Sequence, residues 1–138
     1  MCSSDLVAPS IGSARWYKLV WNVPFNGLGI AGGPGGRNTQ QVLEDPKLQQ
    51  EARDLMDEVL AASAKLGYPQ EAGLIEKEIA RTRTMGPYKS SSQLDWEADK
   101  PVELESIWGE ALRQGTAAGV PMPHLKKLYE KLRGMVKV

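Results

Sequence analysis

A chain of 138 residues is long enough to bury a substantial core and short enough to form one domain. Hydrophobic residues make up 41% of it and charged residues 25%, values near those of ordinary globular proteins, which excludes wholesale disorder. The 17 basic and 17 acidic side chains cancel, so the chain has no general attraction for nucleic acid or acidic membranes, and we expect neither as a partner.

The cysteine content and the first residues bear on where the protein works. Cys2 is the only cysteine, which excludes an intrachain disulfide and fits a reducing, cytoplasmic setting. Residues 1–12 have no basic region followed by a sustained apolar run, so they do not resemble a signal peptide. No apolar run is long enough to cross a bilayer. We therefore expect a soluble, cytoplasmic protein.

The first predicted element is a very apolar helix over about residues 13–25. It is followed by GLGIAGGPGGR, which is too glycine-rich to remain helical throughout. Gly27, Gly29 and Gly32 spell Gly-x-Gly-x-x-Gly, but that fingerprint binds dinucleotides only between a strand and a helix N-terminus. Because a helix precedes these glycines, we expect no nucleotide site here.

The next predicted elements are a short capped turn and a long amphipathic helix. Asn38 and Thr39 are residue types that cap a turn, and Asp45 followed by Pro46 is the pattern of an N-cap with proline at the first helical position. From there apolar residues recur at steps of three and four up to Gly67, which we expect to end the helix in the left-handed conformation.

Four further segments lead to the C-terminus and show helical patterns. They are a helix over residues 69–85, a short turn around residues 94–98, a helix over residues 102–119, and a last helix over residues 124–137. Alternating β-branched runs bounded by turns are nearly absent. We therefore predict an all-α fold, a single domain of five or six helices without internal repeats.

Lys18, Asn22 and Asn26 form a polar stripe on the otherwise apolar first helix. Each step of four residues advances roughly 40° around a helix axis, so the three side chains lie along one face. Burying an ammonium and two amides without partners costs on the order of a few kcal/mol per group, so something must meet them. Two interpretations remain open: a satisfied internal network with the lysine reaching solvent, or a ligand cleft that faces a small polar anion.

Three blocks of the sequence carry a family resemblance. They are RWYKLVWNVPFNGLGIA, YKSSSQLDWEADKPVELESIWG and VPMPHLKKLYEKL, and they extend in this order from about residue 13 to residue 135. Together they resemble the C-terminal domain of ketopantoate reductases (2-dehydropantoate 2-reductases). That domain opens with Trp-x-Lys-Leu-x-x-Asn-x-x-x-Asn, contains a Lys-Pro-Ser-Met-x-x-Asp…Glu…Gly segment, and ends in a proline-flanked helix.

The resemblance implies a multi-helical domain over residues 13–138, like the C-terminal domain of 6-phosphogluconate dehydrogenases. It implies that residues 1–12 lie at the seam with a Rossmann domain that this chain lacks. Family members reduce a 2-keto acid with NADPH in pantothenate biosynthesis, so the implied partners are a small 2-keto acid and the missing domain. The resemblance implies an NADP-dependent oxidoreductase at full length, with NADPH not bound tightly to this chain and no activity in isolation. A homodimer is a further candidate assembly, since an exposed cleft surface invites self-association.

The resemblance also implies roles for five residues. Lys18 matches the lysine that acts as general acid, and an ammonium suits this role because hydride arriving at a carbonyl carbon leaves an alkoxide. Glu103 matches an acid that engages the substrate hydroxyl near this lysine and is the second catalytic candidate. Asn22 and Asn26 match residues that hydrogen-bond the substrate, and Ser91 matches a serine that binds its carboxylate.

Several residues have a structural alternative or argue against other chemistry. Ser91 precedes a helical turn, where serines often serve as N-caps, and Glu103 could simply complement the dipole of its helix. Ser90 and Ser92 stand where the family usually has proline and methionine, which leaves the identity of the keto acid open. His124 is the only histidine, so we expect no metal site. A rival function is a non-catalytic interaction or dimerisation module that retains the fold.

Overall fold

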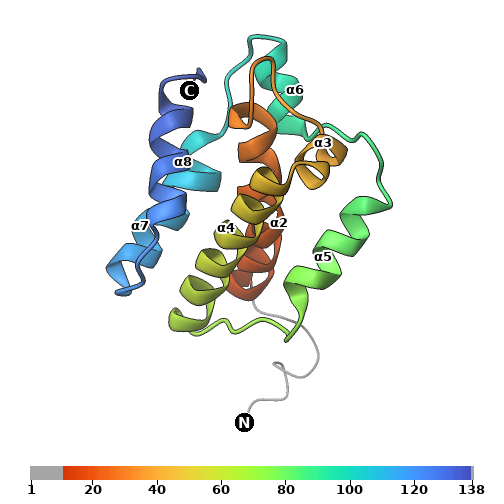
Figure 1. The fold of residues 1–138 in the computed structure, drawn as a ribbon. Coiled ribbons are helices and arrows are strands. Elements are labelled where there is room, and N and C mark those ends of the chain that lie inside the picture. Colours follow the sequence, from red (N-terminus) through yellow and green to blue (C-terminus); the bar gives the residue numbers. More distant parts are fainter. Residues whose placement is uncertain (1–10, 138) are drawn as a thin grey trace.

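The computed structural model describes residues 11–137, and within them the chain is helical with no strand (Figure 1). The elements are α2 (Ile11–Ala31), α3 (Thr39–Glu44), α4 (Pro46–Lys65), α5 (Leu74–Arg83), α6 (Ser91–Glu97), η1 (Glu105–Gly109), α7 (Glu110–Ala117) and α8 (Pro123–Arg133). The all-α prediction is confirmed, and residues 11–137 contain seven α helices and one π helix, η1, where five or six helices were predicted for the chain. The junction with a nucleotide-binding domain was predicted at residues 1–12, and residues 1–10 of it lie outside the described part of the chain.

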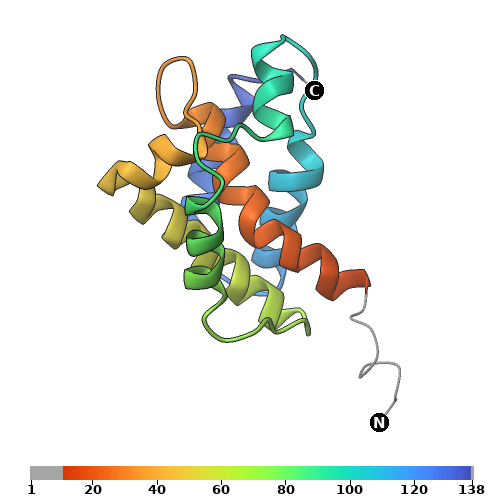
Figure 2. The ribbon, with the colours of Figure 1, turned by 90° about the vertical axis from the view of Figure 1, so that its right-hand side faces the viewer.

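Helix α2 is the central element of the fold. It packs along α4 and also contacts α3, α6, η1 and α8, so that the other helices surround it (Figures 1 and 2). Trp16, Val20 and Val23 are almost completely buried on its inner faces. This arrangement explains why the helix is apolar around most of its circumference. Among residues 11–137 no helix has the length and hydropathy needed to span a membrane.

Helix α2 continues through the first part of the glycine-rich segment and ends at Ala31. Glycine is needed at Gly27 because the packing is close: an added Cβ would lie 2.5 Å from a methyl carbon of Leu128 and 2.9 Å from Nε1 of Trp108. The Trp108 Nε1–H also donates a 3.0 Å hydrogen bond to the Val23 carbonyl of α2. Glycine is therefore used here for the close approach of two other elements and lies inside a helix, outside any phosphate-binding loop.

The helix ends predicted from local signals are confirmed. Asn38 caps α3 in a capping box, in which its side chain accepts from the Gln41 N–H and the Gln41 side chain accepts from the Asn38 N–H. Asp45 Oδ1 accepts a 2.9 Å hydrogen bond at the N-terminus of α4, with Pro46 as the first helical residue. Gly67 follows α4 with φ of +97°, the left-handed conformation that glycine adopts without strain.

The predicted helices over residues 69–85 and 102–119 are shorter and less regular than expected. The first begins only at Leu74, after Gly73, whose φ of +76° interrupts the chain direction. The second begins with the π-helical turn η1 before α7. Trp108 lies in this turn and is fully buried. Apolar spacing indicates a helix but does not distinguish a π turn from an α turn, so this irregularity could not be predicted.

Candidate functional site

The polar stripe of α2 runs from solvent into the protein interior. Lys18 is exposed, Asn22 is half-buried, and Asn26 is only 4% exposed. All three lie on one helix, which fixes their order along the axis and their common face. The stripe therefore starts with a solvent-accessible cation and ends with a buried amide.

The buried end of the stripe lacks a hydrogen-bond partner. The Oδ1 atom of Asn26 is inaccessible to solvent, and no described residue donates a hydrogen bond to it. Leaving a buried acceptor unpaired costs about 1–3 kcal/mol, so such atoms are rare without a structural or functional reason. The satisfied internal network that the sequence left open is thus incomplete at this residue within the described part of the chain. A donor from water, a ligand or another protein segment would complete it.

Aromatic residues form one flank of the stripe. Trp21 stacks on Phe25, with ring centroids 5.2 Å apart, and meets Tyr88 edge-on at 6.2 Å. The Trp21 Nε1–H donates a 2.9 Å hydrogen bond to Thr82 Oγ1 on α5, and the Arg81 guanidinium lies 5.9 Å from the indole ring. This flank is therefore fixed by contacts with α5 and the loop that follows it, which gives the polar stripe a firm apolar border.

The predicted serine lies at the start of α6, which contacts α2 (Figure 2). The N-cap of α6 is Ser90, whose Oγ accepts a 3.3 Å hydrogen bond from the Gln93 N–H. Ser91 is the first helical residue, and its side chain is exposed. The alternative in which Ser91 itself serves as the N-cap is therefore wrong, and its hydroxyl is not committed to capping.

Glu103 lies in the extended segment between α6 and η1 and is exposed. It directly precedes helical Leu104, and its carbonyl accepts a 3.2 Å hydrogen bond from the Ile107 N–H, so its carboxylate can also complement the dipole of this helix and both interpretations stay open. Neither Glu103 nor Lys18 forms an ion pair or side-chain hydrogen bond with any of residues 11–137. Lys18 borders an open hollow that it shares with Tyr17 and Gln70, and this hollow does not include the other four predicted residues.

A polar group that was not predicted from the sequence lies between α4 and α8, two helices that both contact α2. Glu51 and Asp54 of α4 meet His124 of α8, with atoms suited to metal ligation within 4.8 Å of one another. His124 is 73 positions from Glu51 in the sequence, so only the packing of α8 on α4 brings them together. The expectation of no metal site rested in part on the single histidine, and no local spacing signal pairs this histidine with the two acids.

Comparison with known proteins identifies the family. A family model described as "Ketopantoate reductase PanE/ApbA C terminal" matches residues 10–136, nearly the whole chain. The chain belongs to this family. The resemblance drawn from the three sequence blocks is therefore confirmed, and the helical fold is that of a ketopantoate reductase C-terminal domain.

Relatives of this ketopantoate reductase C-terminal domain are longer than the chain. A 2-dehydropantoate 2-reductase from Nostoc sp. is 32% identical over 86% of the chain and 36% of its own length. The crystal structure of 2-dehydropantoate 2-reductase from Methylococcus capsulatus is 38% identical, with a TM-score of 0.82, covering 88% of the chain and 41% of that structure. The corresponding enzyme structure from Geobacter metallireducens is 31% identical, with a TM-score of 0.82, covering 90% and 41%. The chain thus spans about two fifths of these relatives.

Proposed function

We propose that this chain is the substrate-binding and acid-catalytic half of an NADPH-dependent 2-keto-acid reductase. The observation that supports this most directly is the stripe on α2, with an accessible ammonium at Lys18 and an unpaired buried amide oxygen at Asn26. If the side chains that cover this oxygen move aside, a substrate hydroxyl could donate a hydrogen bond to it while the polar end of the substrate lies beside the ammonium. The proposal thus explains an atom that the fold alone leaves unpaired.

The residues described here do not fit a dinucleotide. They contain no strand, and Gly27 and Gly29 lie inside α2, so the strand–turn–helix that faces a pyrophosphate is absent from residues 11–137. NADPH would supply the hydride from a separate Rossmann domain. We accordingly place the helical domain at residues 13–138 and the junction with the nucleotide-binding domain at residues 1–12, and we expect the isolated chain to be inactive.

This chain would supply the proton and hold the substrate. When the keto carbon is reduced, its oxygen gains negative charge, and the Lys18 ammonium would stabilise that charge and donate the proton. Asn22 and Asn26 would hydrogen-bond the substrate along the stripe, Ser91 would bind its carboxylate, and Glu103 would engage its hydroxyl. The absence of any ion pair for Lys18 and Glu103 among the described residues leaves both charges available for such contacts.

The test is to fuse the chain to the nucleotide-binding domain of a relative such as the Nostoc reductase. We expect ketopantoate-dependent oxidation of NADPH, and a loss of at least about a hundredfold in turnover for Lys18→Ala, the scale of general acid catalysis. Lys65→Ala is the matched control, because Lys65 is an exposed lysine and the last residue of α4. An active Lys18→Ala fusion contradicts the assigned role.

The same fusion separates the reductase from the non-catalytic module. A fusion that is folded and binds NADPH but turns over neither ketopantoate nor related 2-keto acids would favour the module. Gel filtration of the isolated chain would then test whether it forms the homodimer that such a module, or an exposed cleft surface, would produce.

A further inference from the structure

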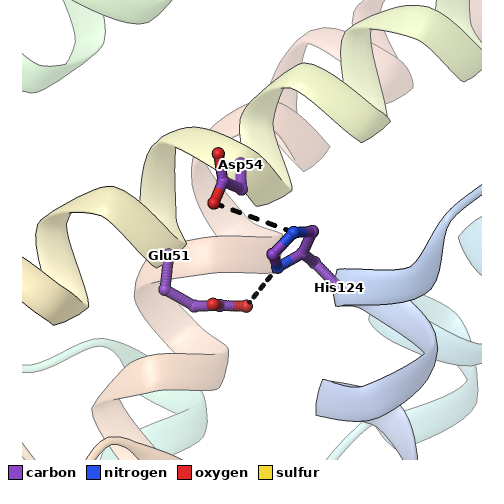
Figure 3. A group of neighbouring side chains, drawn as sticks. All are labelled: Glu51, Asp54 and His124. Carbon is purple, nitrogen blue, oxygen red and sulfur yellow. Dashed lines mark hydrogen bonds and ion pairs between the residues drawn. The ribbon is translucent and has the colours of Figure 1, made fainter.

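Glu51, Asp54 and His124 form a compact polar group between α4 and α8, on elements other than the helix that carries the polar stripe (Figure 3). The imidazole lies between the two carboxylates, with Nδ1 2.9 Å from Glu51 Oε1 and Nε2 3.7 Å from Asp54 Oδ2. The two acids are three residues apart on α4 and therefore share one face of that helix. The group thus combines a nitrogen donor and two oxygen donors from two helices.

The backbone that carries the imidazole is held in place by a third acid. Glu58, which is buried, accepts 2.9 Å hydrogen bonds from the backbone N–H groups of His124 and Leu125. These two contacts fix the first turn of α8 against α4. The His124 ring is consequently presented to Glu51 and Asp54 by an anchored backbone, which is the kind of support that orients metal ligands.

The charge and accessibility of the group favour a cation. With a neutral imidazole the two carboxylates leave the group with a charge of minus two, and with a protonated imidazole it is still negative. The three side chains are 31–39% exposed, so an ion can enter from solvent. The nearby Glu58 carboxylate is already satisfied by the two backbone amides, and Lys47, Lys127 and Lys131 line a hollow on the Glu51 side, where their charges partly offset those of the two acids.

We propose that Glu51, Asp54 and His124 bind a divalent transition-metal ion of the zinc type, which ties α8 to α4. Imidazole nitrogen and carboxylate oxygen are ligands of such ions, with bonds of about 2.0–2.2 Å. Four ligands at that distance around a tetrahedral ion lie about 3.4 Å apart, and the donor atoms here already lie within 4.8 Å of one another. The two acids contact different ring nitrogens, so one carboxylate would have to swing to the side of the nitrogen that binds the ion, and water would fill the fourth position.

The direct test is a calorimetric titration of the whole chain with zinc after treatment with a chelator. It is carried out in a Cys2→Ser background, because a thiol outside the group is a competing zinc ligand. We expect one zinc per chain with a low-micromolar dissociation constant. Asp54→Asn keeps the shape of the side chain but removes its charge and should weaken binding at least about tenfold, as should His124→Gln.

The matched control is Asp57→Asn, an exposed acid on α4 outside the group, which should bind zinc like the parent chain. Circular dichroism of each variant verifies that it is folded, and a zinc-dependent rise in melting temperature should occur in the parent and Asp57→Asn chains only. The proposal is overturned if the parent chain binds no zinc, if Asp54→Asn binds as tightly as the parent, or if magnesium, which prefers oxygen ligands, raises the melting temperature as much as zinc does.

Discussion

Replacing Glu58 by glutamine should destabilise the chain by releasing the first turn of α8. No side chain caps this helix from within its own sequence, and the Glu58 carboxylate of α4 accepts hydrogen bonds from two of its first N–H groups. Hydrogen bonds to a charged group contribute about 1.5–3 kcal/mol each, and a neutral one about 1 kcal/mol. Glutamine keeps one acceptor oxygen but turns an amide donor toward the other N–H. We therefore expect a loss of about 2–5 kcal/mol in the free energy of unfolding.

Urea unfolding followed by circular dichroism, with a chelator present, measures this loss. The slope of the unfolding free energy against urea concentration should not change. Asp57→Asn is the control, since its exposed carboxylate makes no such contact, and it should stay within about 0.5 kcal/mol of the parent. If Glu58→Gln were also indistinguishable from the parent, the buried carboxylate would not be what holds α8, and the anchored presentation of His124 would lose its basis.

Two further predictions concern charge and the unpaired amide. The pKa of His124 lies above its usual 6.5, first because of the hydrogen bond to Glu51 and then because of the nearby acids. Metal-free protein should therefore gain stability from His124 below the unfolded-state pKa and lose it as pH rises through the folded-state value; urea unfolding of parent and His124→Gln chains should differ more at pH about 5.5 than at pH about 9. Asn26→Leu should stabilise the isolated chain by about 1 kcal/mol, because an unpaired buried acceptor is removed, yet should abolish turnover of the fusion. A less stable leucine variant would show that Asn26 is satisfied in the folded chain.

The elements that could be predicted from the sequence are those whose ends carry local signals. Asn38, Asp45 with Pro46, and Gly67 each specify a cap through their own side chain or backbone freedom, and the structure uses all of them as expected. Ser90 shows the limit of this reasoning. In a run of three serines the spacing alone did not indicate which one caps α6.

The candidate site was predictable along one helix but not across helices. The order of Lys18, Asn22 and Asn26 follows from helical geometry, whereas the missing partner of Asn26 depends on how the other helices pack around α2. The group at His124 depends entirely on the contact between α4 and α8. Sequence reasoning fails at such places because a side chain's partners far along the chain leave no periodic trace near it.

Helix α2 contributes both to the stability of the domain and to the proposed binding of substrate, through different positions of one helix. Its apolar positions hold the domain together, and the polar stripe assigned to substrate runs from exposed Lys18 to buried Asn26. Replacing Lys18 and Asn22, which are not buried, would remove the proposed catalytic and substrate contacts while leaving the buried apolar positions unchanged. Proteins that descend from such a domain can therefore lose the catalytic activity while they keep the fold. A shared fold among distant relatives is thus weak evidence for a shared reaction.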